Sequence, residues 1–173
     1  MRRFVGGLVA AVLVAGTVSA APTETPKHFI TRLFALYATN SPWWNAPQDS
    51  PAGKRLQAQF YDPTFTRLMD DNSTLASKSG DEDLDYDPVC QCQDSGATYH
   101  YLSGAPAGGA LFNAKVDDNG TAPWTIVLTS ASGSWRVWDV VDSTGSIRAR
   151  LTRDNACMRR YTDDASLIRC EGN

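Results

Sequence analysis

The stretch that decides the fold is residues 124–141, WTIVLTSASGSWRVWDVV. In its first part Trp124, Ile126 and Leu128 alternate with threonine and valine, which is the period of a strand with one buried face. The segment SASG then provides a break of hairpin length, and the remainder from Ser134 to Val141 has the composition of a second strand. This stretch therefore predicts an antiparallel hairpin.

Two further strands are predicted immediately upstream, at Thr98–Leu102 and Ala110–Val116. The glycine-rich segment Gly104–Gly109 is expected to turn between them, and Asp117–Gly120 is expected to turn into the hairpin described above. Because each predicted strand is followed by a short turn, the sequence indicates an antiparallel meander of about four strands.

Helices are predicted before the strands, because a capping residue precedes a proline at three places: Thr25-Pro26, Ser50-Pro51 and Asp62-Pro63. The first helix has apolar residues at three-and-four spacing and is expected to end near Asn40; the second is expected to end at about Tyr61. The polar and acidic segment 72–87 is expected to be a solvated linker. Helices followed by an antiparallel sheet indicate the α+β class.

The chain begins like a secretory precursor. Arg2 and Arg3 precede an apolar run from Val5 to Val18, and small residues suit cleavage after Ala20. A retained membrane anchor is the alternative, but the run is shorter than the roughly 20 residues of a spanning helix. We therefore expect a signal peptide at 1–20, a single domain at 21–173 without a membrane span, and a secreted or periplasmic location.

The four cysteines predict two disulfides and no free thiol, because an even count in an exported chain favours complete pairing. A bond between Cys90 and Cys92 would close a very tight ring, so we expect at least one long-range bond to Cys157 or Cys170. Pairing within each segment is the competing arrangement. The sequence has no zinc spacing and no cofactor motif, so neither a metal nor a cofactor is expected.

Charge argues against a nucleic-acid partner, because the formal net charge is −3 and falls further when Arg2 and Arg3 are removed. The acidic run Asp81-x-Asp83-x-Asp85 imitates the start of a calcium loop but lacks the glycine and glutamate that such a loop needs further on. It is interpreted as a solvated loop. The pair Trp43-Trp44 is interpreted as a cap on the core.

A resemblance rests on three short segments: DPVCQCQD at 87–94, WRVWDV at 135–140 and GSIR at 145–148. In these the chain resembles a family of exported bacterial proteins, classed as a domain of unknown function, whose fold is similar to nuclear transport factor 2 and cystatin. The resemblance implies a cone-like α+β fold and an exported location, and no biochemical role. At Ser146–Leu151 alternation favours a strand, whereas Ser146 as a cap and the four-residue spacing of Ile147 and Leu151 favour a helix. With the support of the resemblance, a helix is expected there.

Two functions are carried forward from the sequence. The first is a binding or inhibitory module that recognises a protein partner or a small apolar ligand, since the chain has five tryptophans and no catalytic motif. The alternative is a small cofactor-free enzyme in which His100 works with a carboxylate such as Asp139 inside the cone. Strand alternation sends Tyr99 and Tyr101 to one face and His100 to the other.

Overall fold

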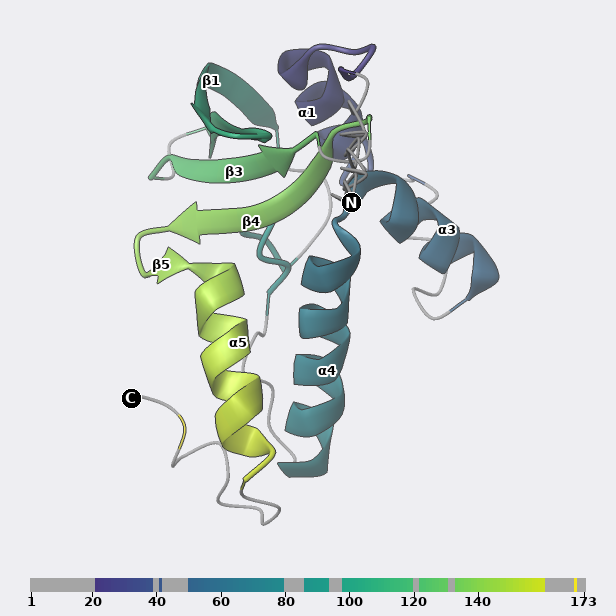
Figure 1. Ribbon diagram of the computed structural model, residues 1–173, viewed down its shortest axis with the longest axis vertical. Helices are drawn as coiled ribbons and strands as arrows, with labels where there is room; N and C mark the ends of the chain where they lie inside the picture. Colours follow the sequence, from purple (N-terminus) through teal and green to yellow (C-terminus); the bar gives the residue numbers. More distant parts are fainter. Residues whose placement is uncertain are drawn as a thin grey trace, which may run out of the picture.

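A five-stranded antiparallel sheet is the frame of the computed structural model, which describes residues 21–38, 41, 50–79, 86–93, 98–119, 122–130, 133–160 and 170 (Figure 1). Its strands follow one another as a meander in the order β1-β2-β3-β4-β5. They are β1 (Tyr99–Gly108), β2 (Leu111–Asp118), β3 (Trp124–Thr129), β4 (Arg136–Asp142) and β5 (Gly145–Ser146). The predicted α+β class and the predicted meander are therefore confirmed, with β5 as an additional short strand.

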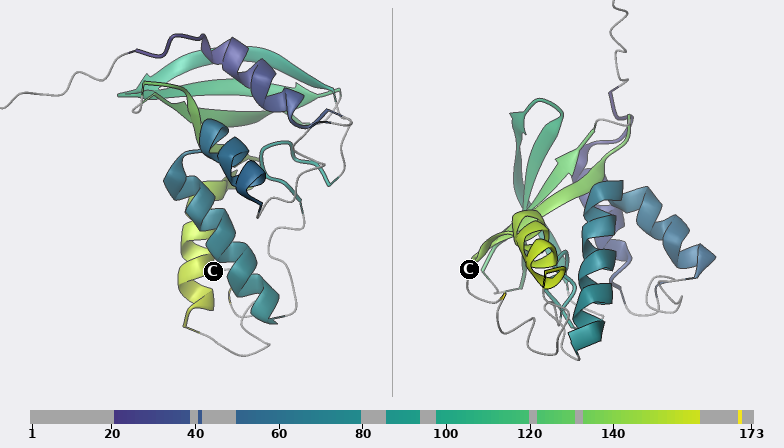
Figure 2. Two further views of the ribbon diagram at one scale, coloured as in Figure 1. Left: turned by 90° about the vertical axis from the view of Figure 1, so that its right-hand side faces the viewer. Right: turned by 60° about the horizontal axis from the view of Figure 1, so that its bottom comes forward.

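One face of the sheet forms the core, as the alternation in β3 predicts. Trp124, Ile126 and Leu128 are all 3% exposed or less. Helix α1 (Pro26–Ala35) lies across this face and contributes Phe29 and Leu33, which are fully buried (Figure 2). Burial of large apolar side chains from both layers supplies the main favourable term for folding.

The helices begin where the cap-proline pairs predict. The side chain of Thr25 accepts a hydrogen bond from the amide of His28, and Ser50 accepts one from Gly53, at the starts of α1 and α3 (Pro51–Phe60). Asp62 accepts hydrogen bonds from the first-turn amides at the start of α4 (Pro63–Ser79). Each cap satisfies amides that have no partner within the helix.

The prediction of a linker at 72–87 is wrong for its first part, because α4 continues to Ser79. Figures 1 and 2 show why: α4 runs beside α5 (Ile147–Met158), away from the sheet. Asn72 is 3% exposed and donates to the side chain of Asn155, and Ala76 packs against Met158. These tertiary contacts hold a polar sequence in a helix that its composition did not indicate.

The prediction of a turn at Gly104–Gly109 is also wrong in its extent, because β1 continues to Gly108. A side chain at position 104 would collide with the ring of Phe112 and the hydroxyl of Tyr101. Gly104 is therefore a strand residue that lets the ring of Phe112 lie against the backbone. The turn itself uses Gly108 and Gly109, both with positive φ.

The helix predicted at Ser146–Leu151 is confirmed. The side chain of Ser146 accepts a hydrogen bond from the amide of Ala149, and α5 extends beyond the predicted end to Met158. Ile147 and Leu151, the pair at four-residue spacing, are both fully buried.

The prediction of a long-range disulfide is wrong. The bonds are Cys90–Cys92 and Cys157–Cys170, and no cysteine of the described residues is free. The tight ring forms because Gln91 has a φ of 54°, a left-handed conformation that turns the chain between the two cysteines. Their Cα atoms lie 5.1 Å apart, within the ordinary range for a disulfide. Two disulfides are compatible with an oxidising compartment.

Several expectations concern parts of the chain outside the described residues: the signal peptide at 1–20, the Trp43-Trp44 pair and the acidic run at Asp81–Asp85. Within the described part of the chain, no helix is both long and apolar enough to cross a membrane.

The two disulfides should differ in their contribution to stability. The bond Cys157–Cys170 joins residues 13 apart and contributes about 3 kcal/mol on the chain-entropy model, whereas Cys90–Cys92 joins residues 2 apart and contributes about 1.6 kcal/mol. Replacing both cysteines of one pair by alanine, with the other pair as the matched control, should show this order in urea unfolding. A larger loss for the Cys90–Cys92 pair would contradict it.

Candidate functional site

His100 lies on β1, on the exposed side of the strand. Its Nδ1 is 3.1 Å from Oδ1 of Asp117, the residue opposite it on β2, and about half of its side chain is exposed. Ion pairs at such exposed positions contribute little. His100 therefore has a carboxylate partner, but at the surface of the sheet.

The structure does not bring His100 and Asp139 together. Asp139 on β4 lies in register with Ala105 on β1, since the strand pairings run through Val127 and Asn113. Three strand spacings amount to about 14 Å, and His100 is several residues further along β1. Direct proton transfer between the two predicted catalytic residues is excluded by this separation.

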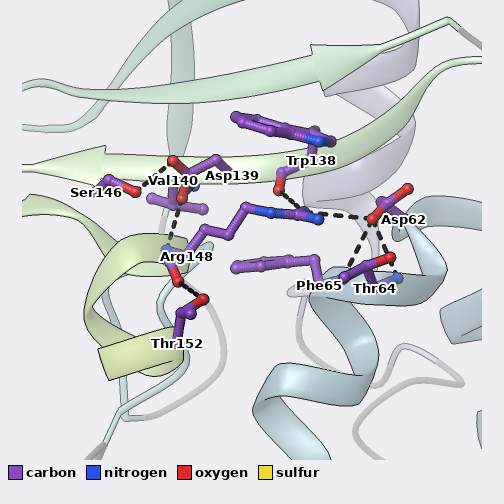
Figure 3. A network of polar contacts seen from close by, with 9 residues as sticks. All are labelled: Asp62, Thr64, Phe65, Trp138, Asp139, Val140, Ser146, Arg148 and Thr152. Carbon is purple, nitrogen blue, oxygen red and sulfur yellow. Dashed lines mark hydrogen bonds and ion pairs between the residues drawn. The ribbon is translucent and has the colours of Figure 1, made fainter. Parts of the chain in front are cut away.

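Asp139 instead organises the junction between β4 and α5 (Figure 3). It is 4% exposed, and its carboxylate accepts hydrogen bonds from the amide of Val140 at 2.8 Å, the hydroxyl of Ser146 at 2.6 Å and the amide of Arg148 at 2.8 Å. A β-bulge at Trp138 changes the alternation of β4 just before Asp139. Asp139 is thus a structural carboxylate at the positive end of a helix.

Arg148 extends this junction to α4. Its guanidinium donates to the carbonyl of Trp138 at 2.7 Å and is paired with Asp62 at 3.3 Å. It also lies 4.5 Å from the centre of the Trp138 ring, and Figure 3 shows it between that ring and Phe65. One side chain therefore ties the start of α5 to β4 and to the cap of α4.

A second polar cluster lies within the core and joins three distant segments. Tyr37 follows α1 and is fully buried, Tyr61 follows α3 and is 2% exposed, and Asp87 precedes the first cysteine. The Tyr37 hydroxyl donates to Oδ2 of Asp87 at 3.0 Å and lies 2.7 Å from the Tyr61 hydroxyl. Because Tyr37 uses its one proton on Asp87, Tyr61 donates to Tyr37.

Burial decides the charge state in this cluster. Burial raises the pKa of the Asp87 carboxyl above its ordinary value, while hydrogen bonds from Val89 and Tyr37 lower it by less. Burial and the neighbouring Asp87 charge together raise the pKa of Tyr37 and of Tyr61 well above the ordinary value for a phenol. Both tyrosines therefore stay protonated and act as donors.

Tyr99 packs against aromatic side chains of α1 and β3. Its ring stacks on Phe34 at 4.2 Å and meets Trp124 edge-on at 6.1 Å. Its hydroxyl is buried and has no hydrogen-bond partner among the described residues. Burial is the main cause that raises the pKa of Tyr99.

The cysteine turn is built directly on Asp87. The amide of Asp87 donates to the carbonyl of Cys92 at 3.0 Å, and the amide of Gln91 donates to the carbonyl of Asp87 at 2.9 Å. Oδ1 of Asp87 accepts the amide of Val89 at 2.8 Å. Cys90 is 1% exposed and Cys92 is partly exposed, so the disulfide runs from the core toward the surface.

A third feature is the β1 edge segment, Leu102–Gly108. All of its residues are exposed, Leu102 by 46%, and none is charged. β1 is the first strand of the sheet and pairs only with β2. Within the described residues, no hydrogen bond other than those with β2 engages this segment.

Sequence reasoning missed the Tyr37–Tyr61–Asp87 cluster. The three-and-four spacing of the first helix includes Tyr37 as an apolar position, because hydrophobic periodicity does not register the polar tip of a tyrosine. Asp87 belongs both to the predicted linker 72–87 and to the motif that carries the family resemblance, and neither pattern indicates its contact with Tyr37. In the described part of the chain, no group of three or more histidine, cysteine or acidic residues could hold a metal ion.

Removing the Asp139 carboxylate should destabilise the protein. Asp139→Ala leaves a buried amide, a half-buried amide and a hydroxyl without their acceptor, so we expect a loss of about 2–4 kcal/mol in urea unfolding. Asp117→Ala, which removes a half-buried carboxylate whose partner His100 is exposed, is the control and should cost less than about 1 kcal/mol. Equal losses in the two variants would contradict the assigned role.

The raised pKa of Asp87 gives a dependence of stability on pH with a defined sign. In the unfolded chain the carboxyl ionises near its ordinary pKa of about 3.9, whereas the folded protein holds it protonated to higher pH. The stability of the wild type relative to Asp87→Asn should therefore fall as pH rises from about 3.9 through the folded-state pKa. Urea unfolding of both proteins between pH 3.5 and 7 measures this difference; a difference that grows with pH would show the sign to be wrong.

The chain is similar to the uncharacterized protein YqhG of Escherichia coli (strain K12). The two are 27% identical over 157 residues, which is 86% of this chain and 49% of the relative. The chain therefore spans about half the length of the relative it matches. No family model matches the chain, and no solved structure matches it.

Proposed function

We propose that the protein is an exported binding module that recognises an extended segment of a partner protein by pairing it with the β1 edge segment. The single observation that carries the proposal is the exposed, uncharged outer edge of Leu102–Gly108. A free strand edge offers a row of backbone donors and acceptors to a second chain. Such pairing needs no catalytic group.

The composition of the edge supports this proposal. Proteins commonly protect an exposed edge with charged side chains, and the β1 edge segment has none. Leu102 adds an exposed apolar side chain that a partner residue could cover. Pro106 lacks an amide hydrogen and so limits the pairing at one position.

The similarity to YqhG is compatible with a module that works as part of a longer protein. The aligned region is 49% of YqhG, so in that protein a comparable region is attached to about as much further chain. The proposed export and the proposed nuclear transport factor 2-like or cystatin-like family membership remain parts of this proposal. The alternative, a cofactor-free enzyme, has lost the His100–Asp139 pairing on which it was based.

The experiment compares immobilised wild-type protein with an edge variant, Ala105→Lys with Ala107→Lys, in a periplasmic extract. Lysines on the edge should prevent strand pairing. Ala58→Lys is the matched control, because Ala58 is exposed on α3, away from the sheet edge. We expect a partner that is retained by the wild type and the control and lost, by at least tenfold, on the edge variant.

Hydrogen exchange on the recovered complex then locates the contact. We expect protection of the β1 edge amides on binding, because strand pairing shields them from water. Protection confined to another surface, equal recovery on the edge variant, or a purified protein that already pairs this edge with a second copy in solution would each overturn the proposal.

A further inference from the structure

The Cys90–Cys92 disulfide contributes little to folding stability, because its two cysteines are close together in the sequence. It joins residues only 2 apart, so it restricts the unfolded chain much less than Cys157–Cys170, which joins residues 13 apart. The turn around it is also closed without it, by the backbone hydrogen bonds between Asp87, Gln91 and Cys92. This small contribution to stability leaves room for a second role of the bond.

The backbone within the ring is strained. Gln91 has a φ of 54°, a left-handed conformation that residues other than glycine adopt rarely. Its side chain holds this conformation by donating from Nε2 to the carbonyl of Pro88 at 2.7 Å. Trp124 fixes the turn from the core side by donating to the carbonyl of Val89 at 3.0 Å. Strain that is imposed by surrounding contacts is a feature of functional sites.

The two sulfur atoms lie in different surroundings. Cys90 is 1% exposed, whereas Cys92 is partly exposed and followed by the exposed Gln93. The Sγ of Cys90 lies 3.7 Å from the carbonyl oxygen of Asp87 and 3.6 Å from that of Cys92. A thiol at Cys90 would have a carbonyl acceptor within reach for its single proton once the two sulfur atoms move apart.

We propose that Cys90–Cys92 is a thiol–disulfide exchange site that oxidises a pair of cysteine thiols in another protein, with Cys92 as the sulfur that is attacked. This activity is independent of strand pairing at β1. It requires only a partly exposed disulfide whose second sulfur can leave. The buried carboxyl of Asp87 shapes the turn from below by accepting the amide of Val89.

The exchange balances in two displacements. A thiolate of the dithiol substrate attacks Sγ of Cys92, forming a mixed disulfide and breaking the Cys90–Cys92 bond; Cys90 leaves as a thiolate and is protonated. The second substrate thiolate attacks the substrate sulfur of the mixed disulfide, and Cys92 leaves as a thiolate and is protonated. Two substrate thiols become one disulfide, and the two electrons and two protons pass to Cys90 and Cys92.

Glutathione redox buffers test the site in the intact protein, with Cys157–Cys170 as the internal control. The oxidised protein is incubated with reduced glutathione, quenched with acid, alkylated and analysed by peptide mass. We expect Cys90–Cys92 to be reduced at least tenfold faster than Cys157–Cys170 while tryptophan fluorescence stays that of the folded protein. Reduction of Cys90–Cys92 only together with unfolding, or no faster than the control bond, would overturn the proposal.

The stoichiometry of the exchange is tested with a fluorescent peptide that carries two reduced cysteines. We expect one peptide disulfide to form for each protein disulfide consumed, and none with the Cys90→Ala, Cys92→Ala double variant, which retains Cys157–Cys170. Peptide oxidation that persists in the double variant, or that is absent in the wild type, would count against the exchange.

The direction of attack is tested by a matched pair, Cys90→Ser and Cys92→Ser. The free Cys92 of the first should form a mixed disulfide with oxidised glutathione at least tenfold faster than the free Cys90 of the second, because Cys90 is buried. Limiting alkylation of the reduced wild-type protein gives the same comparison without a substitution, and Cys92 should be labelled first. Faster labelling of Cys90 would reverse the assignment.

Discussion

Two tyrosine hydroxyls and one carboxylate meet inside the core, where they are hydrogen-bonded to one another. They follow α1, follow α3 and begin the cysteine turn, so two hydrogen bonds fix the relative positions of three segments that are distant in sequence. A buried polar group that loses its partner costs about 1–3 kcal/mol. The hydrogen bond from Tyr37 to Asp87 therefore fixes the position of the cysteine turn relative to α1.

A second carboxylate, Asp139, has a comparable structural role at the junction between β4 and α5. It holds the first turn of α5 against β4, and Arg148 carries that connection to α4. Both carboxylates use their oxygens on backbone amides and side-chain donors of the protein itself. The two activities that we propose use other parts of the fold, namely the Cys90–Cys92 disulfide and the edge of β1.

The sequence predicted the parts of the fold that depend on local patterns. The alternation of Trp124, Ile126 and Leu128 identified the core face of β3, and capping side chains identified the helix starts. Local sequence patterns did not predict two features that depend on contacts with distant residues. One is the bulge at Trp138, which changes the face of β4 on which Asp139 lies. The other is the packing against α5 that keeps residues 72–79 helical. The cysteine pairing was predicted wrongly because the left-handed conformation of Gln91 has no signature in residue type.

The site was predicted least well, since a tyrosine in an apolar stripe gives no indication that its hydroxyl meets a carboxylate. The arrangement of the three segments that carry Tyr37, Tyr61 and Asp87 depends on Asp87, a hydrogen-bonded carboxyl beneath the cysteine turn whose pKa is raised by burial. Carbon-13 NMR titration of the Asp87 carboxyl in the native protein tests it most directly. The structure predicts a pKa above the ordinary value of about 3.9; a pKa at or below that value would contradict the account.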